Sequence, residues 1–297
     1  MKKILILSDG RIGHVNQSIA FAKYLDCAYD IVEVKFKTKF FKVLSYVCDN
    51  IGIKVKGLFN AEVHARYDIV VGAGSGTYYA TKVLAKEMHA KSITMMLPKG
   101  YRFDFDIIYM QNHDAVAKQK NMIELPANFA YVEPQGIYHK TKKRSISMVI
   151  GGDNKVFRMS VVRLKEQLDF IKTYYTGYEL AISTSPRTSK QVEELVQSYY
   201  FDYEVIFSKT PVNPIPDFLE QCETILITGD STSMISEAIS YGKANVVVLP
   251  LESKNDNKFT RFIHTLAQKD YIHIFDGTID NKNNKIDFTY YAQQAIT

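Results

Sequence analysis

The amino-acid sequence predicts an α/β protein of two successive domains, each with an open parallel sheet between layers of helices. Its 297 residues exceed one ordinary core and fit two domains of about 150 residues each. Short β-branched runs alternate with segments whose apolar residues recur at helical spacing, which is typical of βαβ units. The alternation stops once, near the middle of the chain, and then restarts.

In the first half, six short apolar runs predict strands: Lys3–Leu7, Ile31–Phe36, Asp68–Gly72, Ser92–Met96, Asp106–Met110 and Met122–Leu125. Val15–Leu25 and Thr77–His89 lie between them and have the apolar spacing of helices. Residues 127–144 break the alternation with a proline, a glycine and a basic run, which is typical of a linker. We therefore predict an N-terminal Rossmann-like domain over residues 1–140.

The second half repeats the pattern, with predicted strands at Ser145–Gly152, Tyr178–Ser183, Asp202–Phe207, Thr224–Gly229, Asn245–Pro250 and Tyr271–Phe275. Val161–Tyr175 and Gln191–Tyr200 have helical spacing. A second Rossmann-like domain is thus expected over residues 141–275. Residues 276–297 form a tail, and its helical segment Asp287–Thr297 is a candidate to return to the first domain.

Composition narrows the class of protein. No apolar stretch reaches the roughly 20 residues that span a bilayer, and the N-terminus lacks the features of a signal peptide. We therefore expect a cytoplasmic protein. Its three cysteines are odd in number and widely spaced, which argues against a disulfide framework or a structural zinc site.

The stretch "KFKTKFFKVLSY" interleaves four lysines with three phenylalanines, and two interpretations stay open. Such a pattern suits a peripheral contact with the anionic inner face of a membrane. Alternatively, it is a strand and an amphipathic helix whose phenylalanines are core and whose lysines are solvated. Nucleic acid is not expected as a partner, because no zinc finger, helix-turn-helix or aromatic RNA-binding signature accompanies the charges.

Glycine-rich and polar loops follow several predicted strands: "SDGRIGHVNQS", "GAGSGT" and "MQNHD" in the first half, and "GGDNKVFR", "STSPRTS" and "TGDSTSMISE" in the second. The carboxyl ends of parallel strands form the binding crevice of an open sheet, so we expect chemistry in these loops and a cleft between the domains. No P-loop and no G-x-G-x-x-G pattern occurs, which argues against kinases and dehydrogenases.

No metal or other cofactor is expected. Asp104 and Asp106 resemble the metal-binding pair of some sugar transferases, but they lie at the start of a predicted strand and are more simply carboxylates at its edge. The sequence contains neither an H-E-x-x-H motif nor paired cysteines.

Five motifs occur together in one order: "SDGRIGHVNQS", "FDIIYMQNHD", "VIGGDNKVFR", "STSPRTS" and "TGDSTSMISEAISYGKANVVVLPL". In this combination the chain resembles the family named for a plant mitochondrial fission protein, whose bacterial members are regarded as glycosyltransferases. The resemblance runs from the first strand to about Phe275. More distantly, the chain is similar to GT-B glycosyltransferases such as the peptidoglycan enzyme that adds N-acetylglucosamine to a lipid-linked acceptor.

The resemblance implies a GT-B-like fold in which the second domain binds a nucleotide-diphosphate sugar as donor. Ser231, Thr232 and Ser233 stand at a predicted helix N-terminus, where amides and hydroxyls can hold a diphosphate. Glu237, about one turn on, matches a ribose-binding glutamate of the peptidoglycan enzyme, although it can simply complement the helix dipole. The other donor-side candidates lie in the loops and are Gly151, Gly152, Arg158, Ser185, Arg187 and Asp230. The family usually has two successive arginines where this chain has Pro186 and Arg187.

The first domain would hold a glycan or lipid-linked acceptor. His14 matches a candidate base of the peptidoglycan enzyme, and an imidazole can take a hydroxyl proton near neutral pH. Asp9 can orient it, Asp114 is a rival base, and a structural histidine closing the turn is the alternative. The acceptor-side candidates are Gly13, Asn16, Gly74, Ser75, Gly76 and His113.

These expectations combine into an inverting, metal-independent glycosyltransferase that moves a sugar to an acceptor hydroxyl. Two alternatives stay open. The same fold can support hydrolysis or epimerisation of a nucleotide-sugar, or it can act without catalysis as a recruitment protein.

Overall fold

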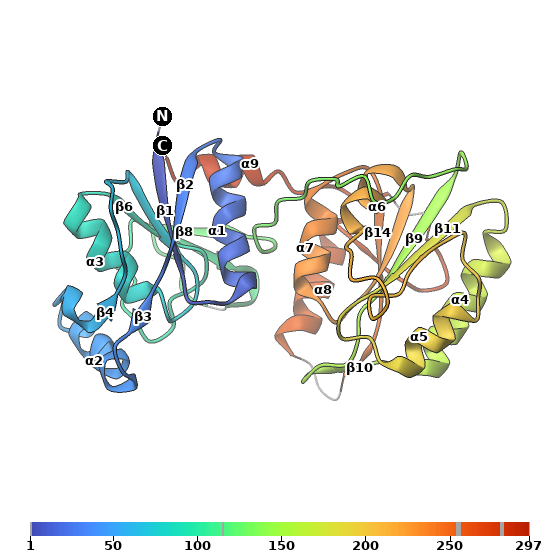
Figure 1. The fold of residues 1–297 in the computed structure, drawn as a ribbon, viewed down its shortest axis with the longest axis horizontal. Helices are drawn as coiled ribbons and strands as arrows, with labels where there is room; N and C mark the ends of the chain where they lie inside the picture. The colour runs from blue at the N-terminus through green and yellow to red at the C-terminus, as the bar shows by residue number, and fades with distance from the viewer. Residues whose placement is uncertain (1, 115, 254–256, 280–281, 297) are drawn as a thin grey trace. The chain divides into compact units, whose positions relative to one another are not determined.

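The computed structural model describes residues 2–114, 116–253, 257–279 and 282–296, with His113 described in its backbone alone. The chain forms two compact units, one of residues 1–131 with 287–297 and one of residues 132–286. Each unit contains a six-stranded sheet in which all neighbouring strands are parallel (Figure 1). The predicted α/β class with two parallel sheets is confirmed.

The sheet of unit 1 has the order β2-β1-β5-β6-β7-β8. Its strands are β1 (Lys3–Ser8), β2 (Ala28–Glu33), β5 (Ile69–Gly72), β6 (Lys91–Thr94), β7 (Ile107–Gln111) and β8 (Met122–Leu125). The inner strand β1 has four consecutive buried residues, as expected for a parallel strand covered on both faces, whereas the edge strand β2 has none that is fully buried. A two-stranded antiparallel ribbon, β3 (Lys35–Phe36) with β4 (Phe59–Asn60), lies outside this sheet.

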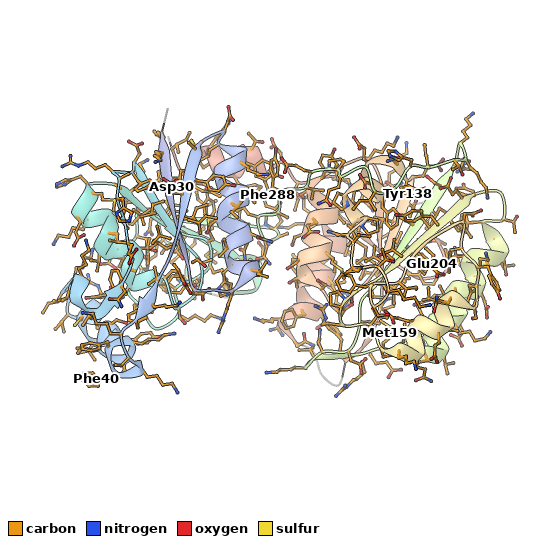
Figure 2. All side chains as sticks on the ribbon, in the orientation of Figure 1. Asp30, Phe40, Tyr138, Met159, Glu204 and Phe288 are labelled. Carbon is orange, nitrogen blue, oxygen red and sulfur yellow. The ribbon has the colours of Figure 1, made fainter. Side chains whose placement is uncertain are left out.

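The helices of unit 1 are α1 (Ile12–Tyr24), α2 (Lys39–Asn50), α3 (Tyr78–Met88) and α9 (Phe288–Gln293), with short 3-10 turns η1 (Lys56–Leu58) and η2 (Asn112–Asp114). Helices α1 and α9 cover one face of the sheet and α3 the other (Figure 1). Helix α9 belongs to this unit because Phe288, labelled in Figure 2, stacks on Phe129 with ring centroids 4.9 Å apart.

The sheet of unit 2 has the order β12-β11-β9-β13-β14-β16. These strands are β9 (Ser145–Ile150), β11 (Glu179–Thr184), β12 (Tyr203–Val205), β13 (Thr224–Thr228), β14 (Asn245–Leu249) and β16 (His273–Ile274). The helices are α4 (Val161–Tyr174), α5 (Lys190–Gln197), α6 (Ile215–Gln221), α7 (Thr232–Ser240) and α8 (Lys258–Gln268), and a second antiparallel ribbon joins β10 (Phe157–Arg158) to β15 (Glu252–Ser253). Helices α4 and α5 lie on one side of the sheet, and α7 and α8 on the other (Figure 1).

The division between the units falls after Tyr131, earlier than the predicted boundary at residue 140. The reason is a set of hydrogen bonds: the backbone amides of residues 135–138 donate to the buried carboxylate of Asp217 in α6. This anchors the proline- and glycine-containing segment to unit 2. At the other end, the return to unit 1 begins at Asp287 rather than at residue 276, because Ile279 and Ile286 are buried in unit 2.

The structure contains no helix, within the residues it describes, that has the length and apolar character needed to cross a bilayer.

Candidate functional site

Each sheet has one place where the strand order reverses. In unit 1 the strand β1 lies between β2 and β5, and in unit 2 β9 lies between β11 and β13. The loops after two such neighbouring strands diverge to opposite faces and leave a crevice between them, which is where open parallel sheets bind ligands. Of the predicted loops, "SDGRIG" and "GAGSGT" therefore meet in unit 1, and "GGDN" and "TGDSTS" meet in unit 2.

His14 and Asp9 form a pair at the reversal point of unit 1. The imidazole Nδ1 lies 3.0 Å from Oδ2 and 3.2 Å from Oδ1 of Asp9, and both side chains are largely buried. The carboxylate can only accept, so Nδ1 carries the hydrogen and Nε2 is left as an acceptor. The expected helix after Val15 in fact begins at Ile12, which places His14 in its first turn rather than in the loop. Helix α1 has no side-chain cap, and the amides of His14 and Val15 donate to the carbonyl oxygen of Arg11, so within the described residues only those of Ile12 and Gly13 remain open at its start.

The glycine loop after β5 packs directly on this pair. Gly74 has φ +83°, and a Cβ built there would lie 2.3 Å from His14 Nδ1; a Cβ on Gly76 would lie 2.6 Å from Asp9 Cβ. These two glycines are thus required by the close approach of the loop to His14 and Asp9. Ser75 between them accepts a hydrogen bond at Oγ from Lys42 Nζ of α2, at 3.2 Å.

The other unit 1 candidates are less closely associated. Asn16 is exposed, and it points to a different side of α1 than His14 because residues two apart on a helix do not share a face. Gly13 has open space where a Cβ would be. Asp114 is held in its own turn, where Oδ2 accepts from the amide of Gln111 and Oδ1 lies 3.5 Å from Lys99 Nζ. The side chain of His113 lies outside the described residues.

A buried aspartate organises the reversal point of unit 2. Asp230 accepts from Thr228 Oγ1 at 2.7 Å through Oδ1, and from the amide of Gly152 at 3.2 Å through Oδ2. The amide of Gly151 donates to Thr228 Oγ1 at 2.7 Å. A Cβ on Gly151 would meet the Asp230 carboxylate, and one on Gly152 would lie 1.9 Å from the carbonyl oxygen of Arg187. These two glycines therefore serve close packing between loops, and their amides are already bonded.

The two predicted arginines are both in ion pairs. Arg187 donates through Nη2 to Asp230 Oδ2 at 2.5 Å while nearly half of its side chain stays exposed. Its backbone amide donates to Ser185 Oγ, so Ser185 holds the loop that presents Arg187. Arg158 pairs with Asp153 at 3.0 Å and is mostly exposed. Of the two, Arg187 alone is joined to the reversal point through Asp230.

Helix α7 starts at this point. The Ser231 hydroxyl caps it by accepting from the amide of Met234 at 3.4 Å. The hydroxyls of Thr232 and Ser233 have no hydrogen-bond partner among the described residues, and Ser233 is exposed. With the helix dipole, these hydroxyls and the first amides can bind an anion.

Glu237 follows Ser233 by four residues and so lies on the same face of α7, about 6 Å along the axis. Its carboxylate is partly buried and has no donor or cation in contact within the described chain. Burial raises the pKa of Glu237 from 4.5 to about 7. An acid perturbed by burial, on a helix that begins at the carboxyl end of a parallel strand, is a candidate for ligand contact.

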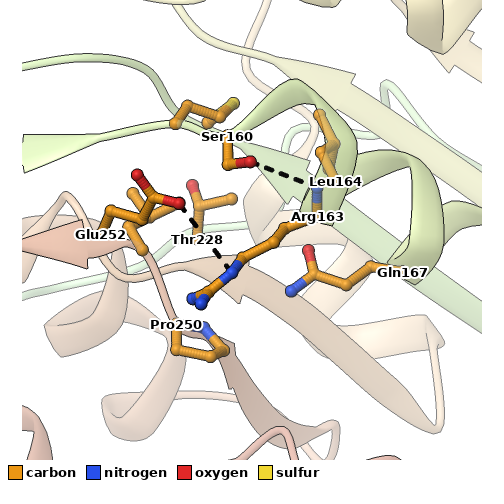
Figure 3. Close-up of a pocket in the computed structure, with 9 residues that line it drawn as sticks. Ser160, Arg163, Leu164, Gln167, Thr228, Pro250 and Glu252 are labelled. Carbon is orange, nitrogen blue, oxygen red and sulfur yellow. Dashed lines mark hydrogen bonds and ion pairs between the residues drawn. The ribbon is translucent and has the colours of Figure 1, made fainter.

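A small hollow lies beside the same strand ends, between the start of α4 and the segment after β14 (Figure 3). Ser160 caps α4 by accepting from the amide of Arg163, whose guanidinium Nε lies 3.9 Å from Glu252. Thr228 and Gln167 also line it. Polar side chains therefore line part of the hollow. One of them, Thr228, also accepts the hydrogen bond from the amide of Gly151.

No cluster of three or more histidine, cysteine, aspartate or glutamate side chains suited to a metal ion occurs in the described ranges. Asp104 and Asp106 diverge: Asp104 pairs with Lys82, and Asp106 Oδ2 accepts from the amide and hydroxyl of Ser92. Both carboxylates therefore serve local structure.

Sequence reasoning missed Tyr78 and Lys42. Burial raises the pKa of Tyr78 to about 12, with smaller contributions from the charges of Asp114 and Asp9, and its hydroxyl donates to the carbonyl oxygen of Leu97 at 3.4 Å. Tyr78 directly follows the "GAGSGT" loop, and this position in the sequence could have indicated that it lies near the candidate site. Lys42 gave no signal of its own, because its contact with Ser75 joins residues 33 apart in the chain.

A family model described as "Mitochondrial fission ELM1" matches residues 12–296. The chain belongs to this family. It is also 24% identical to the uncharacterized protein RP120 of Rickettsia prowazekii (strain Madrid E), over 93% of this chain and 91% of that protein.

Solved structures show the same fold. MurG of Acinetobacter baumannii has a TM-score of 0.50 at 14% identity and matches 100% of this chain and 90% of its own. A Listeria monocytogenes protein described as a UDP-N-acetylglucosamine 2-epimerase reaches 0.52 at 10% identity, over 99% and 87% of the two chains. The glycotransferase of kitacinnamycin reaches 0.52 at 11% identity, over 93% and 86%. The expected GT-B-like fold of two Rossmann-type units is confirmed.

Proposed function

We propose that this protein is an inverting glycosyltransferase that moves a sugar from a nucleotide-diphosphate sugar to the hydroxyl of a glycan or lipid-linked acceptor. The observation that carries the proposal is the face of α7. It presents open hydroxyls and amides at its positive end, and one turn on it presents the unpaired carboxylate of Glu237. A diphosphate linked to a ribose offers an anion and a pair of hydroxyl donors, and their separation is comparable to that between the start of α7 and Glu237.

In this proposal the donor diphosphate binds at Thr232 and Ser233, and Glu237 accepts hydrogen bonds from the ribose. Arg187, already held near α7 by Asp230, supplies positive charge to the leaving group. Arg158 is a second, exposed cation that can approach the same phosphates. Helix dipole and guanidinium together make the step possible without a metal ion.

His14 is the proposed base. Asp9 fixes the ring with hydrogen on Nδ1, so Nε2 can take the proton of the acceptor hydroxyl. The acceptor oxygen forms a bond to the anomeric carbon as the bond from that carbon to the diphosphate oxygen breaks, and the nucleoside diphosphate leaves with the electron pair. Attack opposite the leaving group inverts the anomeric centre.

The glycine loop Gly74–Gly76, together with Gly13 at the open start of α1, would line the acceptor side. Membership in the family and the GT-B-like fold support the class of function. The fold is equally that of the epimerase-like Listeria protein, so the reaction is distinguished by its products.

The test is a calorimetric titration of the full chain with nucleoside diphosphates of each base. We expect one of them to bind, and Glu237→Ala to weaken it by about 10- to 100-fold, the usual effect of removing a charged hydrogen-bond partner. Glu194→Ala, at an exposed position of α5, is the matched control and should leave binding unchanged. Equal binding by Glu237→Ala contradicts the ribose contact.

Incubation of the bound nucleotide-sugar without acceptor separates the remaining functions. A transferase leaves the donor largely intact, whereas release of free sugar or isomerised donor indicates hydrolysis or epimerisation. Failure of every nucleotide to bind contradicts all three enzymatic functions and favours a recruitment protein.

A further inference from the structure

Helix α2 has two apolar faces, although only one of them packs against the core of unit 1. Phe41, Leu44 and Cys48 pack against the core of unit 1. A second stripe points to solvent and recurs at intervals of three and four residues, with exposed fractions of 68% for Phe40, 62% for Val43, 52% for Val47 and 64% for Ile51. Phe40 is labelled on α2 in Figure 2.

The stripe continues into the next segment. Ile53 and Val55 are also exposed, so residues 40–55 hold six of the fourteen large exposed hydrophobic residues in the described chain. Scattered single apolar residues are normal on a protein surface, but a set gathered on one helix and the segment directly after it marks a binding surface. We call the six residues Phe40, Val43, Val47, Ile51, Ile53 and Val55 the α2 stripe.

Lysines surround the α2 stripe. Residues 34–57 contain six lysines and a single acidic residue, a net charge of 6 − 1 = +5, which equals the formal net charge of the whole chain. The acidic residue, Asp49, is buried and paired with Lys82, so it does not neutralise the surface. Lys37 and Lys39 are exposed and have no acidic partner among the described residues.

From this we infer that the α2 stripe and its lysines bind the surface of an anionic lipid bilayer, with the apolar side chains among the acyl chains and the lysines at the headgroups. Two of the six lysines are in ion pairs, Lys35 with Glu33 and Lys56 with Glu87. Charge complementarity still favours this occupant, because the lysines outnumber these acidic residues beside an apolar stripe, which matches an apolar layer edged by negative charge. Lysine stems also reach from an apolar boundary to a polar layer. The inference does not depend on the proposed transferase activity, since α2 lies in unit 1 and the nucleotide is assigned to unit 2.

The contact of Lys42 with Ser75 links α2 to the glycine loop after β5. Tyr101 bonds to Ser45 of α2 at 2.9 Å and to the carbonyl oxygen of Ser75 at 3.4 Å. The lipid-binding helix is therefore tied at two points to the glycine loop that packs on His14.

The test is co-sedimentation of the full chain with vesicles of phosphatidylcholine alone or of phosphatidylcholine mixed with phosphatidylglycerol. We expect binding to the mixed vesicles alone, and a loss of at least about tenfold in Phe40→Ser/Val47→Ser and in Lys37→Glu/Lys39→Glu. Val162→Ser/Tyr174→Ser and Lys190→Glu/Lys269→Glu change exposed residues of the same types in unit 2 and should bind as the unchanged chain does.

Equal binding to both kinds of vesicle, or no binding to either, overturns the inference. So does binding that the two α2 variants retain. A change of oligomeric state in Phe40→Ser/Val47→Ser without any vesicle binding would overturn it in favour of self-association. Nucleotide titration of the same variants should be unchanged, which separates this inference from the proposed function.

Discussion

The imidazole of His14 is held by the carboxylate of Asp9 through a contact of 3.0 Å between Nδ1 and Oδ2. The two residues come from opposite sides of a short connection, Asp9 directly after β1 and His14 in the first turn of α1. This arrangement selects one tautomer and leaves Nε2 as the acceptor. The pair therefore has the geometry of an oriented general base.

Asp9→Asn tests that orientation. An asparagine amide can donate to Nδ1 and so favour the other tautomer, in which Nε2 carries the hydrogen and cannot accept a proton. We expect turnover of the nucleotide-sugar and acceptor to fall by about 10²- to 10⁴-fold, the range typical of losing general base catalysis. Affinity for the nucleoside diphosphate should stay the same in calorimetry. Glu87→Gln, on the surface of unit 1, is the control, and full turnover by Asp9→Asn would exclude this role.

Gly74→Ala tests the packing of the glycine loop on His14. The backbone at Gly74 has φ +83°, which alanine adopts poorly, and the new Cβ would lie 2.3 Å from Nδ1. We expect loss of turnover together with a decrease of about 1–3 kcal/mol in the unfolding free energy of unit 1. Gly177→Ala, which has open space at its Cβ, should change neither measurement. A fully active and stable Gly74→Ala would show that the loop does not position the histidine.

Glu237→Gln should stabilise the protein in a pH-dependent way. The pKa of Glu237 is raised from 4.5 to about 7 by burial, so between these values the native state keeps a proton that the unfolded chain releases. The unfolding free energy of the unchanged protein therefore falls as the pH rises through this window. Glutamine has no such proton, so the unfolding free energy of Glu237→Gln should exceed that of the unchanged protein by an amount that grows to about 3 kcal/mol above pH 7.

Chemical denaturation of unit 2 at several pH values measures this advantage. It should vanish below about pH 4.5, where glutamate is neutral in both states. Glu194→Gln on exposed α5 should give no such window. A pH-independent difference for Glu237→Gln would mean that Glu237 is not protonated in the native protein near neutral pH.

The strands were predictable because parallel strands covered on both faces are short apolar runs. All six residues of β9 and all five of β13 are buried, and both runs are visible in the sequence. The ribbons β3–β4 and β10–β15 were not predicted, because two paired residues carry no periodic pattern. The start of α1 was placed three residues late, since Ile12 and Gly13 precede the first clear helical spacing.

The places of the candidate loops in the fold were predictable, but the contacts of their residues were not. The sequence placed polar loops at the ends of strands, whereas the strand order that brings Asp230 beside Gly151 depends on the whole sheet. Arg187 and Asp230 are 43 residues apart in the chain, and no local pattern announces their ion pair. The two glycines of the "GGDN" loop were expected to approach a ligand, yet they approach neighbouring protein groups.

The buried ion pair of Lys82 and Asp49 gave no signal in the sequence, since a lysine on an amphipathic helix is normally solvated. Lys82 Nζ donates at 2.7 and 2.8 Å to the two oxygens of Asp49, and it also contacts Asp104.

Lys82→Met would leave the carboxylate of Asp49 buried without a cation, which typically lowers the unfolding free energy by about 3–5 kcal/mol. Denaturation of unit 1 should show this loss, and Lys82→Met/Asp49→Asn should recover part of it because the fully buried charge of Asp49 is then removed, whereas Asp104 is partly exposed to solvent. Since α2 is joined to α3 through this pair, we also expect Lys82→Met to loosen α2, which faster amide hydrogen exchange in residues 39–50 would reveal. Unchanged stability and exchange would mean that packing alone holds α2 in place.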